Sequence, residues 1–276
     1  EGTQCGVSVA ATAERDGEIQ VGSAGASTRA YAELDFAQVG RDAAFRAGSL
    51  LGSRKLPTGR RAVLFDPWVS GELLELVSGL LSADEVQRGK SLLRGKLGKA
   101  VCGKDVTFID DPWRPGAIGS SLFDAEGVPT RRKVLIENGV LREYFHDSYT
   151  AHKEGVASNG SAGRSSFKGV PGPGSSNFYL QPGSFTRDGL LRDTADGILV
   201  LEIMGMHTAD PVSGEFSVGV SGIAIEKGEP AGGVRGAMLS GNLLEMLSRV
   251  DGVADDLIFY GSLAAPTFRV ADMTVA

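Results

Sequence analysis

Alternation of apolar and polar residues predicts strands along most of the chain, several of them paired through tight turns. The clearest pair is residues 132–136 and 140–145, joined by Asn138-Gly139. This dipeptide readily supplies the two positive φ angles of a type I′ turn. Weaker alternation over residues 5–24 turns at Asp16-Gly17, and another turn is predicted at Lys227-Gly228. Further strands are predicted at residues 62–65, 106–109, 197–204, 216–225, 257–260 and 267–275.

Helical spacing is confined to a few segments. From Phe36 to Leu50 the apolar residues share one face, with Asp35 as N-cap, and residues 69–81 form an apolar helix. Residues 82–85 (Ser-Ala-Asp-Glu) fit a capping box for a short helix that ends near Gly89, and residues 240–242 cap a helix through Leu247. The pattern predicts an α+β, β-rich fold with large antiparallel sheets built from hairpins and a few flanking helices.

Composition narrows the class of protein. The 276 residues suffice for one large domain or two modest ones, and 39 glycines against 11 prolines indicate many tight turns. The net charge of −6 argues against nucleic-acid binding. Two cysteines give no disulfide framework, which favours a cytoplasmic protein, and neither a signal peptide nor an apolar run of about 20 residues predicts a membrane segment. Glu1 falls in what reads as a strand, so we expect a fragment of a longer protein.

Tests for enzyme chemistry find no active site. Gly89-Lys90-Ser91 ends like a phosphate-binding loop, but Asp84 stands where that loop needs a glycine. The three histidines, His146, His152 and His207, form no metal-binding pair. The loop at residues 155–176 is long enough to be functional or disordered. No catalytic residue is therefore predicted from the residues alone.

A resemblance to a known family rests on several blocks that occur in order. They include FDAEGVPTRRKVLIENGVL at residues 123–141, HDSYTA at 146–151, NFYLQPG at 177–183, and LSGNL at 239–243. Together they resemble the TldD/PmbA family, the so-called modulators of DNA gyrase, which are related to peptidases. The resemblance implies that residues 59–276 form its β-rich C-terminal domain. Residues 1–58 would be a remnant (hairpin, helix and linker) of an N-terminal α/β domain.

The family's metal motif is missing at the positions that match it. TldD-like members carry HExxxH on the helix that corresponds to residues 69–81, together with a cysteine near the C-terminus. The resemblance places Glu75 and Leu80 at the two histidines, Leu76 at the catalytic glutamate, and Tyr260 at the cysteine. Leucine neither binds zinc nor acts as a general base, so we expect no metal, no cofactor and no catalytic residue.

The chain accordingly looks like a PmbA/TldE-like subunit that lacks the metal and supports peptide binding and proteolytic processing. The resemblance implies a TldD-like metallopeptidase subunit or self-association as partner, and unfolded peptide as substrate. Peptide contacts are expected at Ser158, Asn159, Gly160 and Arg164. Two alternatives stay open. One is a solitary hydrolase with an unusual carboxylate metal site around Glu75, Asp84 and Glu85, and the other is a pure peptide-binding or assembly protein.

Overall fold

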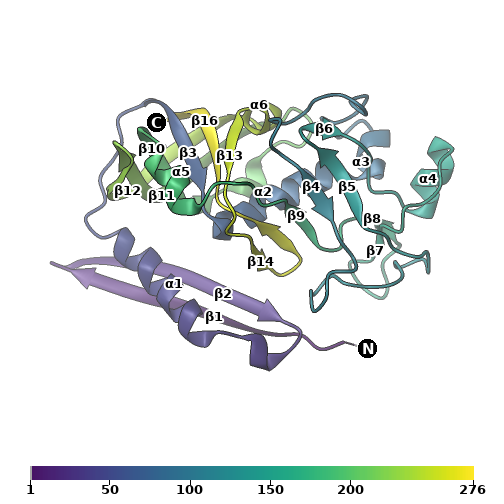
Figure 1. Cartoon of the computed structure of the whole chain (residues 1–276), viewed down its shortest axis with the longest axis horizontal. Coiled ribbons are helices and arrows are strands. Elements are labelled where there is room, and N and C mark those ends of the chain that lie inside the picture. Colours follow the sequence, from purple (N-terminus) through teal and green to yellow (C-terminus); the bar gives the residue numbers. More distant parts are fainter. Residues whose placement is uncertain (1) are drawn as a thin grey trace.

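The computed structural model describes residues 2–276, apart from the side chain of His207. It contains two six-stranded sheets with helix α2 (Pro67–Leu80) between them, and an N-terminal hairpin covered by helix α1 (Phe36–Ser49) (Figure 1). The predicted β-rich α+β fold is confirmed. No helix in the described part of the chain is long and apolar enough to cross a membrane.

The first sheet has the strand order β12-β11-β10-β3-β16-β13. Its strands are β3 (Gly59–Phe65), β10 (Asp196–Met204), β11 (Glu215–Glu226), β12 (Glu229–Asn242), β13 (Val250–Val253) and β16 (Phe268–Val275). Only β3 and β10 are parallel to each other within this sheet. Because β12 also pairs with β16, at Leu239 and Val275, five of the strands close into a ring.

The second sheet has the order β14-β15-β9-β4-β5-β6. Its strands are β4 (Phe108–Asp110), β5 (Lys133–Glu137), β6 (Val140–Leu141), β9 (Phe178–Leu180), β14 (Ile258–Tyr260) and β15 (Leu263–Ala265). The predicted turn between β5 and β6 is confirmed, with φ of 48° at Asn138 and 78° at Gly139. The strand predicted to reach residue 145 was too long. It ends at Leu141, since Arg142 N donates to Leu135 O and Phe145 N donates to Leu81 O, both at 2.8 Å.

Helix α2 joins the two sheets, with contacts to β10 on one side and to β9, β14 and β15 on the other. It begins two residues before its predicted start, because Asp66 accepts a hydrogen bond from Trp68 N and Pro67 occupies the first turn. The predicted capping box at Ser82 was wrong. Ser82 forms a β-bridge with Phe145, and its side chain does not cap the short helix α3 (Ala83–Gln87).

The N-terminal hairpin consists of β1 (Cys5–Arg15) and β2 (Glu18–Thr28), with the predicted turn at Asp16-Gly17. Helix α1 lies against one face of it and is capped by Asp35, as predicted. The close approach needs glycine at position 22, where a Cβ would lie 2.2 Å from Ala47 N. A 3₁₀ turn at Tyr31–Glu33 precedes α1.

Two clusters of charged side chains stabilise the fold, one between α1 and the start of α2 and one within the first sheet. Asp66 Oδ1 lies 3.0 Å from Arg46 Nη2 of α1, and its Oδ2 lies 2.7 Å from Arg187 Nη2. Arg269 on β16 makes a two-pronged contact with Asp251, at 2.9 and 3.1 Å. Such planar arginine pairs fix geometry as well as charge. The first cluster therefore ties the hairpin and α1 to the start of α2.

Several short elements escaped prediction. They are β7 (Ala162–Gly163), β8 (Gly172–Pro173), α4 (Ser148–Glu154) and α5 (Arg187–Arg192), as well as strands β9, β13 and β15. Strands β7 and β8 pair within the long loop at residues 155–176. Helix α6 (Leu243–Ser248) follows its predicted cap at Asn242. Both cysteines are free, and burial raises the pKa of the Cys102 thiol to about 12.

Candidate functional site

A groove of about 840 Å³ runs beside the C-terminal half of α2. We call it the α2 groove. Its apolar lining comes from Leu76 and Leu80 of α2 and from the end of β10 and the 3₁₀ turn η2 (Met206–Thr208). Carboxylates and one lysine add charge. The lining residues are Glu72, Glu75, Leu76, Gly79, Leu80, Glu85, Lys90, Ile203, Gly205, Met206 and Pro211.

The residues at the family's metal positions do not fit a zinc ion. Leu76 is half-buried and Leu80 is buried, and both turn hydrocarbon toward the α2 groove. Tyr260 lies elsewhere, with its ring 4.9 Å from that of Trp68 at the opposite end of α2. From Trp68 to Leu80 the helix rises by roughly 18 Å. Burial raises the pKa of Tyr260 to about 12, so its phenol stays neutral at ordinary pH.

The alternative carboxylate site is brought together only in part. Glu75 and Glu85 both line the α2 groove, whereas Asp84 forms an ion pair with Arg88 at 3.0 Å. Within residues 2–276, leaving aside the side chain of His207, no group of three or more His, Cys, Asp or Glu side chains is placed to hold a metal ion.

The four residues expected to contact peptide differ in their surroundings. Asn159 is buried and holds the chain after β6, because Oδ1 accepts from His146 N at 3.0 Å and Nδ2 donates to Tyr144 O at 2.8 Å. Ser158 Oγ donates to His146 O at 3.3 Å. Arg164 is exposed and donates to Gly169 O at 2.9 Å. Gly160 lines a pocket.

That pocket, of about 510 Å³, lies between β7, β8 and the long loop that precedes β5, and we call it the serine pocket. Hydroxyls and small residues dominate its walls. The lining residues are Asp110, Pro112, Ile118, Gly119, Ser121, Phe123, Asp124, Ala125, Thr130, Gly160, Ser161, Ala162, Gly163, Gly174, Ser175, Ser176 and Ser262. Ser161 Oγ is buried and has no hydrogen-bond partner among the described residues.

A buried ion pair supports the floor of the serine pocket. Asp110 on β4 and Lys133 on β5 face each other in register, with Lys133 Nζ 3.0 Å from Asp110 Oδ2 and both side chains almost fully buried. The contact is an ion pair without the alignment of a hydrogen bond. Asp110 Oδ1 accepts from Ser176 N and Ser176 Oγ, at 2.6 and 2.9 Å. The carboxylate therefore positions Ser176.

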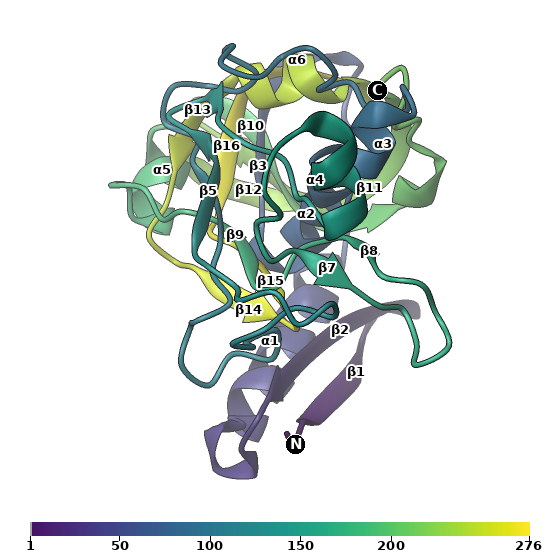
Figure 2. The same cartoon turned by 90° about the vertical axis from the view of Figure 1, so that its right-hand side faces the viewer.

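The two hollows are neighbours on one face of the molecule. Ser78 Oγ of α2 lies 3.1 Å from Ser175 Oγ, between Gly79 of the α2 groove and the wall of the serine pocket. Figure 2 looks onto α4, β7 and β8 on this face, with α2 behind them. Sequence reasoning found α2 but missed the serine pocket, whose walls come from segments more than 60 residues apart, such as Asp110 and Ser176.

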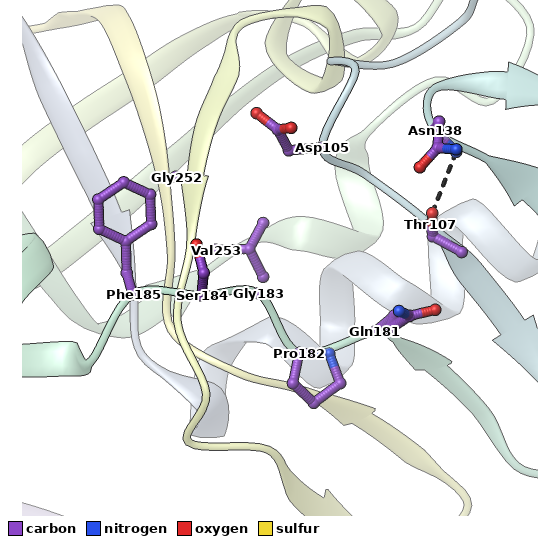
Figure 3. A pocket seen from close by; sticks show the side chains of 10 residues that line it. All are labelled: Asp105, Thr107, Asn138, Gln181, Pro182, Gly183, Ser184, Phe185, Gly252 and Val253. Carbon is purple, nitrogen blue, oxygen red and sulfur yellow. Dashed lines mark hydrogen bonds between the residues drawn. The ribbon is translucent and has the colours of Figure 1, made fainter.

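A third hollow, of about 270 Å³, lies between β13, the segment that precedes β4, and the loop that follows β9 (Figure 3). Asp105, Gln181 and Ser184 give it a polar lining, and Thr107 Oγ1 accepts a hydrogen bond from Asn138 N at 3.0 Å. Gly183 is packed so closely that a Cβ would lie 2.1 Å from Val253 O. The Pro182-Gly183 sequence therefore serves the packing of this loop on β13.

Titration of His146 should link stability to pH. Burial lowers the pKa of His146, against the opposing influence of Glu154, Asp147 and Glu143. The unfolded chain keeps the ordinary pKa of about 6.5 and so takes up the proton first as the pH falls. The neutral, buried His146 should therefore contribute its full stabilisation above about pH 6.5 and lose it as the pH falls through the folded-state pKa. Over that range the free energy of unfolding should fall by at most about 1.4 kcal/mol per pH unit.

Urea unfolding over this pH range would measure the effect. The free energy of unfolding of His146→Gln should depend less on pH than that of the wild type. His152 is exposed on α4, so His152→Gln should keep the wild-type dependence. Equal slopes for the wild type and His146→Gln would contradict the prediction.

Comparison with known proteins identifies a family with a similar sequence. A model described as the PmbA/TldA metallopeptidase C-terminal domain matches residues 58–276. A metalloprotease of Methanothermobacter thermautotrophicus is 37% identical over 224 residues, covering 80% of this chain and 49% of that protein. Metalloprotease PmbA of Escherichia coli O157:H7 is 29% identical over 275 residues, covering 98% of this chain and 59% of that protein.

A solved structure is similar over nearly the whole chain. The crystal structure of a candidate modulator of a DNA gyrase from Thermotoga maritima MSB8 has a TM-score of 0.92 and 36% identity, and the match covers 98% of this chain and 62% of that one. The chain thus spans about half to three fifths of the length of the curated relatives it matches.

Proposed function

Because the chain belongs to the PmbA/TldD family, we propose that it is a zinc-free, PmbA/TldE-like part of a peptidase complex. In this proposal it binds unfolded peptide, and a TldD-like subunit supplies the metal chemistry. Residues 1–58 belong to a preceding α/β domain and residues 59–276 form the C-terminal domain. The net charge of −6 speaks against DNA as the ligand.

One observation carries the zinc-free part of the proposal. On α2, hydrocarbon occupies the positions that would hold a general base and a metal ligand, and Leu76 and Leu80 line an apolar groove there. A catalytic zinc site needs three nitrogen, sulfur or oxygen ligands and an open position for water. The chain would therefore contribute binding and orientation of the peptide, and the hydrolytic step would take place on the partner.

The serine pocket supports the peptide-binding part. A hydroxyl both donates and accepts hydrogen bonds, so it matches the N–H and C=O groups of any extended peptide regardless of the side chains. Ser161 Oγ lacks a hydrogen-bond partner among the described residues, and Gly163 and Gly174 leave the backbone open to close approach. Asp110 Oδ1 accepts a hydrogen bond from Ser176 Oγ and so fixes the position of this hydroxyl in the same pocket.

The decisive experiment uses the full-length protein. Zinc content and cleavage of an unfolded peptide are measured alone and together with a relative that carries HExxxH. We expect no stoichiometric zinc and no cleavage alone, and faster cleavage by the mixture than by the relative alone. Stoichiometric zinc together with activity of the isolated protein would overturn the proposal.

A pair of variants tests the pocket. Ser161→Ala should weaken peptide binding roughly fivefold, as expected for loss of one neutral hydrogen bond worth about 1 kcal/mol. Ser184→Ala changes an exposed hydroxyl outside the serine pocket and should leave binding unchanged. Equal peptide affinity of both variants and the wild type would remove the serine pocket from the binding path.

A further inference from the structure

A further hollow, of about 570 Å³, adjoins the serine pocket. The two share Pro112 and Ser121, which form a common wall, and we call the further one the Trp113 hollow. Most of its lining comes from the segment between β4 and β5. The lining residues are Arg29, Pro112, Trp113, Arg114, Pro115, Gly116, Ser120, Ser121 and Leu122.

The lining of the Trp113 hollow includes large apolar side chains that stand in solvent. Trp113 is 55% exposed and Leu122 is 71% exposed. The indole N–H of Trp113 already donates to Thr130 Oγ1 at 3.2 Å, so the ring offers a ligand its π surface and hydrocarbon. Exposed hydrophobic side chains that gather in this way mark a binding surface more often than isolated ones do.

The charge of the Trp113 hollow is positive. Among the described residues that line it, two are arginines and none is acidic, although the whole chain carries a net charge of −6. The guanidinium carbon of Arg114 lies 4.4 Å from the centre of the Phe259 ring. Guanidinium groups attract aromatic faces and repel other cations. The hollow therefore favours an aromatic side chain over a basic one.

Hydrogen bonds between distant residues hold the segment in shape, although it has no regular secondary structure. Arg29 donates through Nε to Ala117 O and through Nη2 to Ile118 O, both at 2.8 Å. Thr130 Oγ1 donates to Ser121 O at 2.6 Å. A surface that is already ordered loses less conformational entropy when a ligand arrives, so it binds more tightly for the same contacts.

We propose that the Trp113 hollow receives an aromatic side chain of the peptide whose main chain lies in the serine pocket. Successive side chains of an extended peptide point to opposite sides of its backbone. A main chain in the serine pocket therefore directs alternate side chains to one side, and the wall of Pro112 and Ser121 brings the Trp113 hollow within their reach. This inference rests on the proposed function and adds a substrate class to it, namely peptides with aromatic residues.

Three peptides that differ at one position test this preference. Each is a short peptide of glycine, serine and threonine with phenylalanine, alanine or lysine at its centre. Binding to the full-length protein is measured by the fluorescence anisotropy of a label at the end of the peptide. We expect the phenylalanine peptide to bind about tenfold more tightly than the alanine peptide, which corresponds to about 1.4 kcal/mol. The lysine peptide should bind more weakly than the alanine peptide.

Two variants locate the preference in the hollow. Trp113→Ala should reduce the advantage of the phenylalanine peptide to about twofold and leave the affinity for the alanine peptide unchanged. Leu122→Glu adds a carboxylate on an exposed side chain and should raise the affinity for the lysine peptide about threefold. Phe45→Ala is the matched control and should keep the wild-type preference, because Phe45 is an exposed aromatic residue of α1 outside both hollows.

The outcomes separate this inference from the proposed function. Ser161→Ala should weaken the binding of all three peptides by the same factor, because it removes a contact with the main chain. Equal affinities for the three peptides would overturn the inference and leave the proposed function standing. A preference for phenylalanine that Trp113→Ala does not reduce would also overturn it. If none of the peptides bound, the inference and the peptide-binding part of the proposed function would both be wrong.

Discussion

Replacement of Lys133 by methionine should lower the free energy of unfolding by roughly 3–5 kcal/mol. The side chains of Lys133 and Asp110 are 0% and 1% exposed, and they face each other across β4 and β5. Removing the ammonium group would leave the carboxylate buried without its counter-charge, and water cannot reach it in the folded state. The loss should appear in urea or thermal unfolding followed by circular dichroism.

A double variant separates the ion pair from simple packing. Asp110→Asn combined with Lys133→Met removes both charges and keeps an oxygen that can accept from Ser176 N and Ser176 Oγ. Neutral replacements of buried ion pairs are often tolerated. We expect the double variant to recover at least half of the stability lost by Lys133→Met. If Lys133→Met were as stable as the wild type, the ion pair would contribute nothing to the free energy of unfolding.

Substitution of Asp66 by alanine should also cost roughly 3–5 kcal/mol. Asp66 is 4% exposed and contacts Arg46 of α1 and Arg187 of α5, at 3.0 and 2.7 Å. The same carboxylate caps α2 through Trp68 N. Both guanidinium groups would lose their shared partner, and the loss of the cap alone costs about 1 kcal/mol. Amide exchange in α1 and the hairpin should accelerate, because this cluster holds α1 to α2.

Asparagine at position 66 separates the two roles. It caps a helix about as well as aspartate but carries no charge. Asp66→Asn should therefore keep slow amide exchange in the first turn of α2 and still lose most of the stability contributed by the ion pairs. Unchanged exchange in α1 for both variants would contradict the proposed connection.

Local features could be predicted because neighbouring residues determine them. The three hairpin turns have positive φ at Asp16, Asn138 and Lys227, each followed by glycine, as the sequence indicates. Helices α1 and α2 followed from apolar spacing. Helix α4 had a signal that was overlooked, because Asp147 and Thr150 form a reciprocal capping box.

Features that depend on distant segments could not be predicted. Strand β9 has three residues and pairs with β4 and β15, which lie on either side of it in the sequence. The α2 groove takes one wall from α2 and the other from residues 203–211. The resemblance placed Tyr260 with Glu75 and Leu80, but only the fold shows that it packs on Trp68. Contacts between side chains that lie far apart in the sequence leave no pattern among neighbouring residues.

The closed ring of strands has a consequence for how this chain is made. Strand β3 lies between β10 and β16, so its two partners follow it by more than 130 and 200 residues. During synthesis β3 emerges from the ribosome long before either partner, and its exposed edges can meet other nascent chains in that interval. The ring cannot close until residue 275 is available to pair with Leu239. We therefore expect a slow folding step after synthesis and a need for chaperones to protect β3 until then.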